Sequence, residues 1–512
     1  MEALDWLVIG VFFLALIGII VWVVRQKQND SADYFLGGRD ATWLAIGASI
    51  FASNIGSEHL IGLAGAGASS GMAMAHWEIQ GWMILILGWV FVPFYTRSMV
   101  YTMPEFLERR YNPQSRTILS VISLVSYVLT KVAVTVYAGG LVFQQVFGIK
   151  ELWGIDFFWI AAIGLVVLTA LYTIFGGMKS VLYTSVLQTP ILLLGSLIIL
   201  VLGFKELGGW DEMMRVCGAV TVNDYGDTMT NLIRSNDDAN FPWLGALIGS
   251  AIIGFWYWCT DQFIVQRVLS GKNEMEARRG TIFGAYLKLL PVFLFLIPGM
   301  IAFALHQKYI GAGGEGFLPM LANGTANADA AFPTLVAKLL PAGVKGLVVC
   351  GILAALMSSL ASLFNSSAML FTIDFYKRFK PETPEKKLVG IGQIATIVIV
   401  VLGILWIPIM RSVGDVLYTY LQDVQSVLAP GIAAAFLLGI CWKRTSAQGG
   451  MWGLIAGMVI GLTRLGAKVY YSNAGEVADS TFKYLFYDMN WLFFCGWMFL
   501  FCIIVVLSLI HI

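Results

Sequence analysis

Apolar runs long enough to cross a membrane constrain the fold of this chain more than any other feature. About thirteen occur, each near the length that a helix needs to span the hydrocarbon core of a bilayer. Inside lipid, backbone groups find partners only in helices or closed barrels, and no strand-like alternation competes here. The chain is therefore predicted to be an all-α polytopic membrane protein. The predicted spans are 5–24, 43–66, 77–96, 117–147, 157–176, 181–203, 243–266, 280–306, 344–374, 388–410, 414–441, 449–470 and 490–511.

Composition excludes several classes of function. Charged residues make up 12% of the 512 residues, about half of the share in soluble domains, and the net charge is +1. This balance predicts a lipid bilayer as the surroundings and no nucleic-acid partner. The six cysteines have no metal-ligand spacing, and no phosphate loop or Ser/His/Asp set is present. We expect no enzyme, no organic cofactor and no obligate protein partner.

Lys and Arg orient the predicted spans. They are concentrated in short connections such as "RRYNPQSR" and "YKRFKPETPEKK", whereas the long polar loops 204–242 and 307–343 carry mixed charge. Positive connections face the cytoplasm, so both long loops and the N-terminus are predicted to lie outside. The first run, Leu7–Val24, is read as a retained helix and not as a signal peptide. We expect a multi-pass protein of the plasma or inner membrane.

Two of the predicted spans are interrupted by polar residues. The stretch 52–65, "ASNIGSEHLIGLAG", places Gly56 within a run of polar groups, and 253–267, "IGFWYWCTDQFIVQR", contains Thr260, Asp261 and Gln262. Transporters use unwound helices at mid-membrane, where free carbonyls and half-helix ends bind ions and solutes. The interrupted spans are the second and the seventh, which is the offset that a five-plus-five inverted repeat predicts.

This offset divides the chain into repeats and flanking parts. The predicted divisions are 1–42, an N-terminal extra helix and cytoplasmic loop; 43–203, the first repeat; 204–242, an extracellular loop; 243–441, the second repeat, with the loop 307–343; and 442–512, C-terminal extra helices.

A row of hydroxyls follows one face of the span 344–374. Ala355, Ser358, Ser359 and Ser362 are spaced at i, i+3, i+4 and i+7. Small residues at this spacing also serve close helix packing, which is the more common explanation for such a row alone. Beside an unwound helix, however, paired hydroxyls suit sodium, because hard cations prefer oxygen ligands.

Ionisable groups within the apolar segments are candidates for function, because an unpaired charge is costly in lipid. Glu78 is also explained as an acid at the membrane interface, and Lys131 as a structural partner of Asp261 or another acid. Together with the amides of Asn54 and Gln422 and with nearby aromatic rings, the group suits a ligand rich in hydroxyls. The ionisable set is Glu58, His59, Glu78, Lys131, Asp261 and Lys288.

Five stretches closely resemble the sodium:solute symporter family, in particular its sodium/glucose cotransporter branch. The resemblance extends from about residue 30 to about residue 465 and implies a leucine-transporter-like five-plus-five inverted repeat with broken helices and additional flanking helices. The stretches are "FASNIGSEHLIGLAGAG", "YTMPEFLERRY", "WYWCTDQFIVQR", "LMSSLASLFNSSAMLFTIDFY" and "AAFLLGICWKR".

The resemblance implies a set of site residues. Its sodium site corresponds to the carbonyls of Ala52, Ile55 and Ala355 and the hydroxyls of Ser358 and Ser359. The inner gate falls on Tyr257, with Trp258 beside it, and the outer gate on Leu63, Trp77 and Tyr418. Its sugar contacts fall on Asn54, His59, Glu78, Lys288 and Gln422.

Three positions depart from the family pattern. Ser185 and Ala361 stand where two-sodium relatives have aspartate and threonine, so both changes remove oxygen ligands of a second cation. Gly254 replaces an asparagine or threonine that helps to bind sugar. The resemblance therefore implies sodium-driven uptake of a hexose of the glucose or galactose type, with one sodium per sugar. The alternatives are symport of myo-inositol, sialic acid or another polyol, and a sodium-conducting sugar sensor.

Overall fold

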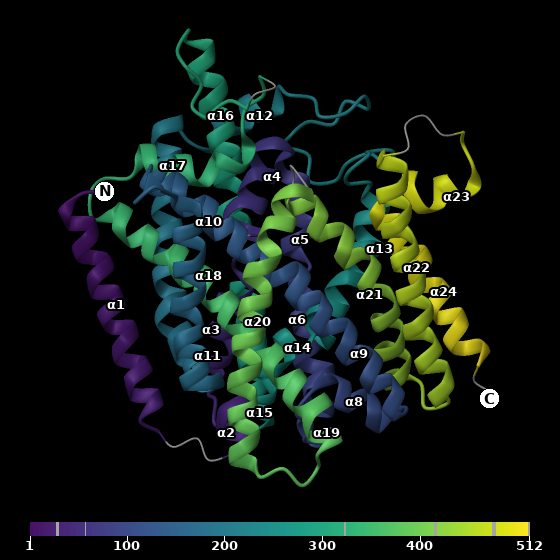
Figure 1. The fold of residues 1–512 in the computed structure, drawn as a ribbon. Coiled ribbons are helices and arrows are strands. Elements are labelled where there is room, and N and C mark those ends of the chain that lie inside the picture. Colours follow the sequence, from purple (N-terminus) through teal and green to yellow (C-terminus); the bar gives the residue numbers. More distant parts are fainter. Residues whose placement is uncertain (27–29, 57, 322–323, 414–416, 474–477, 510–512) are drawn as a thin grey trace.

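The fold is a bundle of helices that run between two ends of the molecule (Figure 1). The computed structural model describes residues 1–26, 30–56, 58–321, 324–413, 417–473 and 478–509. The side chains of residues 129–130, 409–413, 417–423 and 473 are outside this description. One end, here called the loop end, carries α12 and α17; α2, α8 and α19 lie at the opposite end (Figure 1).

The elements of the first half, including short 3₁₀ and π segments labelled η, are α1 (Ala3–Val24), α2 (Ser31–Leu36), η1 (Gly37–Arg39), α3 (Trp43–Asn54), η2 (Glu58–Leu63), α4 (Ala64–Ser69), η3 (Gly71–Ala75), α5 (His76–Ile79), α6 (Trp82–Ile86), η4 (Leu87–Phe91), α7 (Val92–Ser98), α8 (Met103–Arg110), α9 (Pro113–Ser126), η5 (Tyr127–Val132), α10 (Ala133–Phe147), an antiparallel hairpin of β1 (Glu151–Leu152) and β2 (Ile155–Asp156), and α11 (Phe157–Leu207).

The elements of the second half are α12 (Trp210–Gly218), α13 (Trp243–Gly254), η6 (Phe255–Thr260), α14 (Gln262–Leu269), α15 (Glu274–Leu287), η7 (Val292–Leu296), α16 (Ile297–Gly311), η8 (Ala328–Ala330), α17 (Ala331–Leu339), α18 (Val344–Met369), η9 (Leu370–Tyr376), α19 (Lys377–Phe379), α20 (Glu385–Val413), α21 (Leu417–Cys441), α22 (Ala447–Asn473), α23 (Thr481–Lys483), η10 (Tyr484–Asp488) and α24 (Trp491–Ser508).

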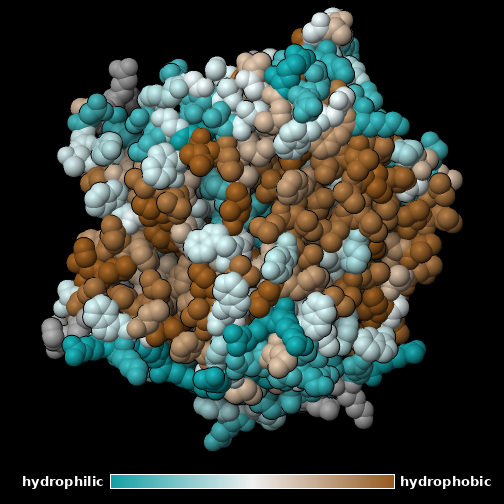
Figure 2. Space-filling model, turned by 180° about the vertical axis from the view of Figure 1, so that it is seen from behind, coloured by the Kyte–Doolittle hydropathy of each residue, from teal (hydrophilic) through white to brown (hydrophobic). Residues whose placement is uncertain are grey.

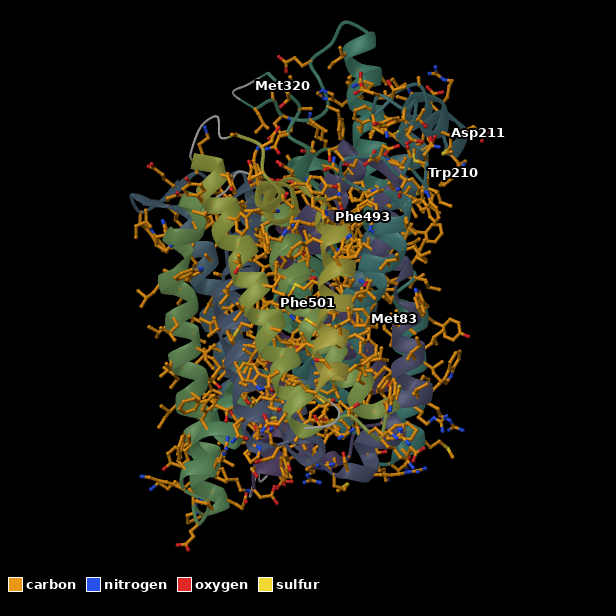
Figure 3. All side chains as sticks on the ribbon, turned by 90° about the vertical axis from the view of Figure 1, so that its right-hand side faces the viewer. Met83, Trp210, Asp211, Met320, Phe493 and Phe501 are labelled. Carbon is orange, nitrogen blue, oxygen red and sulfur yellow. The ribbon has the colours of Figure 1, made fainter. Side chains whose placement is uncertain are left out.

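The surface matches a protein embedded in lipid. Figure 2 shows an apolar band between polar ends. In Figure 3, Met83 and Phe501 lie between the two ends of the molecule, whereas Asp211 and Met320 lie at the loop end. Within the described residues, 10 helical stretches are long and apolar enough to cross a membrane. Each of the thirteen predicted spans corresponds to helical segments, but several are broken into shorter pieces. Fewer helices are therefore long and apolar enough to count as single membrane spans.

Both predicted helix breaks are confirmed. The first break follows α3, where Ile55 is extended, with φ −77° and ψ 108°. The second separates η6 from α14, where Asp261 is extended, with φ −76° and ψ 128°. The Asp261 side chain accepts a hydrogen bond from the Phe263 N–H and so caps α14. Each break leaves polar backbone groups free at its two half-helix ends.

The connection expected between the fifth and sixth spans, residues 177–180, is a single sharp bend in α11. Gly177 has φ +53°, and a Cβ there would lie 2.4 Å from the Tyr34 carbonyl oxygen. Only glycine tolerates both the left-handed backbone and this close approach. The expected pair of helices, 157–176 and 181–203, is thus present on either side of the bend.

The long serine-bearing helix α18 lies at the centre of the bundle. Nearly all of its residues are buried, including Ser358, Ser359 and Ser362. By contrast, α1 lies at one side of the bundle and is mostly exposed (Figure 1). The central position places the hydroxyl row of α18 against α3, the helix that ends at the first break.

Candidate functional site

A small polar cavity lies between the two broken helices. Its volume is about 50 Å³, which is room for only a few water molecules. Ten of its lining residues come from the segments on either side of the two breaks and from α5 and the turn between α5 and α6. The complete lining set is Asn54, Glu58, His59, Leu63, Trp77, Glu78, Gln80, Ile253, Tyr257, Trp258, Lys288 and Gln425. The cavity therefore collects most of the solute contacts that the sequence predicts.

Three ionisable side chains form one cluster in this cavity. The Lys288 Nζ atom lies 2.7 Å from a Glu78 carboxylate oxygen and 2.8 Å from His59 Nε2. His59 Nε2 also lies 3.3 Å from the other Glu78 oxygen. All three residues are buried, so each charge depends on the others for compensation. Glu78 thus belongs to a buried cluster and is not an isolated acid at the membrane interface.

The first break is tied to the second by one polar contact. The Asn54 amide donates to the Tyr257 hydroxyl over 3.0 Å, which connects the end of α3 to η6. Among the described residues, the Asn54 Oδ1 and His59 Nδ1 atoms have no hydrogen-bond partner. A buried polar atom without a partner is costly, and a ligand with several hydroxyls supplies both donors and acceptors.

Most of the predicted gate and solute residues line the cavity. Leu63 and Trp77 do so from the first half of the chain, and Tyr257 and Trp258 from η6. The Tyr257 and Trp258 rings meet edge to face, with 4.9 Å between their centroids. The side chains of Tyr418 and Gln422 are outside the described residues, so their predicted roles stay predictions.

Sequence reasoning missed two glutamines that line the cavity, Gln80 and Gln425. Gln425 is one helical turn after Gln422 in "YLQDVQSV", so the i, i+3 spacing was a usable signal. Gln80 follows Glu78 in "HWEIQGW", but nothing in this motif distinguishes it from an interfacial polar residue. Glu58, to which the sequence assigned no role, also lines the cavity.

The side chain of Gln80 occupies space that the absence of a side chain at Gly254 leaves open. A Cβ atom at Gly254 would lie 2.5 Å from the Gln80 Oε1 atom. An asparagine or threonine at position 254 would therefore displace the Gln80 amide. The Gln80 amide therefore lies in the part of the cavity next to Gly254, where an asparagine or threonine side chain at position 254 would otherwise lie.

Two residues of the predicted sodium site, Ser359 and Ile55, meet where α18 crosses the end of α3. The Ser359 hydroxyl lies 2.8 Å from the Ser53 carbonyl oxygen and 3.3 Å from that of Ile55, and it donates to both. Ala52 directly precedes Ser53 on α3, and Ala355 lies about one helical turn before Ser359 on α18. Sequence reasoning missed the Ser53 carbonyl. This set of neutral, buried oxygens fits a hard monovalent cation.

Ser185 of α11 also reaches this group. Its Oγ atom lies 3.2 Å from the Ser358 Oγ atom. On the other side, the Ser53 hydroxyl lies 2.7 Å from that of Ser362 and accepts a hydrogen bond from the Arg267 guanidinium. A fixed positive charge thus lies one side chain away from the oxygen cluster. In the part of the chain that the structure describes, no carboxylate is hydrogen-bonded to Ser358 or Ser359.

The predicted structural partner of Lys131 is confirmed. Its Nζ atom lies 2.7 Å from an Asp261 carboxylate oxygen, and the Tyr127 hydroxyl donates to the other oxygen. The ammonium also lies 4.6 Å from the centroid of the Tyr257 ring, a cation–π distance. This buried pair anchors η5 to the second break, directly beside the predicted inner gate.

Two helix breaks beside a buried polar cavity, with an oxygen cluster at one of them, are the arrangement that secondary transporters use at mid-membrane. Residues 34–457 match the family model described as the sodium:solute symporter family. The chain is 38% identical to the sodium/myo-inositol cotransporter 2 of Homo sapiens, over 91% of this chain and 70% of that protein. It is 38% identical to the sodium/glucose cotransporter 2 of Rattus norvegicus, over 96% of this chain and 75% of that protein.

The chain therefore belongs to the sodium:solute symporter family. Among solved structures, it is similar to a Na+-coupled sialic acid symporter in a substrate-bound outward-open state, with a TM-score of 0.79 and 21% identity over 100% of this chain and 98% of that chain. It is also similar to MhsT in complex with L-phenylalanine, with a TM-score of 0.54 and 13% identity over 92% and 98% of the two chains. These similarities identify the leucine-transporter fold, and the family supports sodium-coupled symport of a sugar or polyol and no enzymatic activity.

Proposed function

We propose that this protein couples the entry of sodium to the uptake of a hexose of the glucose or galactose type by alternating access. The observation that carries the proposal is the central cavity, where a Lys288–Glu78–His59 cluster and the Asn54–Tyr257 pair surround unsatisfied polar atoms. A hexose offers hydroxyls that both donate and accept, and its C–H faces pack on the neighbouring aromatic rings. The proposed solute contacts are Asn54, His59, Glu78, Tyr257, Trp258, Lys288 and Gln422.

In this proposal sodium binds at the end of α3, through the carbonyls of Ala52 and Ile55 and, from α18, the Ala355 carbonyl and the Ser358 and Ser359 hydroxyls. Bound sodium replaces the hydrogen bonds that Ser359 now donates and holds the unwound segment. Asn54 lies directly before that segment, so the ion orders a solute contact. Coupling follows only if sodium binds one conformation more tightly than the other.

The gates of the proposed cycle lie on opposite sides of the cavity. Leu63, Trp77 and Tyr418 close it toward the loop end, and Tyr257 closes it toward the other end. With the N-terminus and the long loops outside, the loop end faces the exterior of the plasma or inner membrane. Asp5 near the N-terminus accepts hydrogen bonds from the Gly343 and Gly346 N–H groups. These contacts support placing the N-terminus on the same side of the membrane as the loop 307–343.

Uptake of radiolabelled glucose into proteoliposomes tests the proposal. We expect accumulation with an inward sodium gradient and none with potassium in its place. Lys288→Met is expected to abolish accumulation, because it leaves Glu78 and His59 without their cationic partner. Sodium-independent uptake, or none with any of a dozen hexoses, would overturn the proposal.

Myo-inositol is the second candidate, because sodium/myo-inositol cotransporters are among the relatives with 38% identity. Competition by unlabelled galactose, myo-inositol and sialic acid in the same assay ranks the substrates. Current recorded beside flux separates a symporter from a sugar sensor, since a sensor conducts sodium without accumulating sugar.

A further inference from the structure

A second cavity shares Gln80 with the central one and lies between α13 and the loop that precedes it. Its volume is about 350 Å³, within the range of small-molecule sites. Three walls enclose it: η3 to α6, α13, and the loop segment that contains Leu232, Ile233 and Arg234. Ile233 is 71% exposed and Leu247 of α13 is 63% exposed, so the cavity is bordered by exposed apolar side chains.

Two buried polar atoms in the walls of this cavity lack partners. His76 donates from Nδ1 to the Ala73 carbonyl, because a carbonyl oxygen can only accept. In the neutral ring, Nε2 is then an acceptor, and it has no partner among the described residues. The Arg234 Nε–H group is likewise a buried donor with no partner there. A hydroxyl both donates and accepts, so its chemistry suits the His76 acceptor as well as the Arg234 donor.

The cavity has little net charge to attract an ionic head group. Arg234 pairs with Asp238 over 3.5 Å and also donates to the Ser70 carbonyl. Burial works against the charged form of Asp238, but the N–H of Phe241 and the amide of Asn223, together with Arg234, hold its pKa below the usual value. Asp238 is therefore ionised and neutralises Arg234.

We propose that this cavity, called here the rim pocket, binds an uncharged lipid alcohol, whose hydroxyl bridges His76 Nε2 and Arg234 Nε while its apolar body lies against α6 and α13. Gln80 lines both the rim pocket and the central cavity. His76 also contacts the gate residue Trp77, with 5.7 Å between ring centroids. An occupant of the rim pocket thus lies one side chain behind the proposed outer gate.

Photolabelling of the full chain in nanodiscs tests the proposal without any transport assay. The probes are photoreactive analogues of cholesterol and of diacylglycerol, each with a free hydroxyl, and the matched cholesterol methyl ether and phosphatidic acid analogues. We expect both alcohols to label residues within 76–82 or 232–251, and the ether and the anionic probe to label these segments about 2- to 10-fold less, as one lost hydrogen bond predicts.

Two variants and one control variant sharpen the test. His76→Phe keeps a ring against Trp77 and Phe241 but removes the acceptor, so labelling by the alcohols is expected to fall about 2- to 10-fold. Ala251→Trp fills the rim pocket and is expected to abolish labelling. Gly164→Trp adds the same ring to α11, where a Cβ meets nothing within 4 Å, and is expected to leave labelling unchanged. Absence of labelling by both alcohols, or equal labelling by the ether, overturns the proposal.

Discussion

Ser359 illustrates how one hydroxyl joins two helices at the candidate sodium site. Its Oγ atom contacts carbonyls at the unwound end of α3, although it belongs to α18. A Cβ atom at Gly56 would lie 2.9 Å from this oxygen, so the glycine in the break also makes room for it. The number of ligands available to a cation at this crossing therefore depends on the positions of individual atoms.

Replacement of Ser359 by alanine tests the sodium assignment. The loss of an oxygen ligand to a cation is expected to raise the half-saturating sodium concentration by about tenfold or more. The measurement is sugar uptake as a function of sodium concentration. Ser367→Ala is the matched control, because Ser367 is also buried in α18 but its hydroxyl has no partner among the described residues. Unchanged sodium dependence in Ser359→Ala would remove Ser359 from the site.

Gly254 and Gln80 are expected to act on the solute as one unit. In Gly254→Asn the new side chain displaces the Gln80 amide, so the half-saturating sugar concentration is expected to change about 2- to 10-fold, the effect of one hydrogen bond. A double-mutant cycle with Gln80→Ala measures the coupling. We expect the double variant to differ little from Gln80→Ala alone, whereas independent additive effects would contradict the coupling.

At the scale of elements, the breaks in α3–η2 and η6–α14 depend on different partners. The first break is held by polar contacts with α18, and the second by the ionic pair of Lys131 and Asp261. Asp261 also caps α14, so the same carboxylate begins a half-helix and pairs with the Lys131 ammonium group. A charge pair buried in this way is sensitive to the loss of either partner.

Lys131→Met is expected to destabilise the protein by about 3–5 kcal/mol, because it leaves the Asp261 carboxylate buried without its cation. The melting temperature in detergent measures the effect. Combining it with Asp261→Asn, which keeps an acceptor for the α14 cap, is expected to recover part of the loss. Arg215→Met, which breaks an exposed pair with Glu212, serves as the control and is expected to change the melting temperature little. A Lys131→Met protein as stable as the parent would contradict this account.

At the scale of the whole molecule, sodium-coupled transport requires the two ends to open alternately around a fixed site. The central cavity of about 50 Å³ has room for only a few water molecules, so the halves must separate to admit a sugar. The ratio of sodium to sugar then depends on how many cation sites form between the helices. Ala361 supplies no side-chain oxygen, and Ser185 supplies a neutral hydroxyl and no carboxylate.

We expect a charge-to-sugar ratio near one, because only one oxygen cluster is proposed to bind sodium. Current and radiolabelled sugar flux, measured on the same membranes, give this ratio. Ser185→Asp combined with Ala361→Thr restores the oxygen ligands that two-sodium relatives have and is the informative comparison. A ratio near two for the unmodified protein would refute the one-sodium proposal.

Much of this molecule follows from the sequence itself. Apolar runs separated by charged connections specify membrane helices, because lipid offers the backbone no alternative partner. The polar interruptions at Gly56 and Asp261 predicted both breaks, since a polar run is costly in an unbroken membrane helix. The family motifs then indicated most residues that line the central cavity, and the spacing of hydroxyls on α18 indicated the oxygen cluster beside α3.

Tertiary structure alone decided which distant polar groups meet. Lys288, Glu78 and His59 are far apart in the chain, and their pairing depends on how α15, α5 and η2 pack. The Ser53 carbonyl, the fit of Gln80 beside Gly254 and the unpaired atoms of His76 and Arg234 depend on contacts between elements. Sequence spacing specifies faces of single helices, whereas these contacts depend on the distances between helices, which only the packed chain determines.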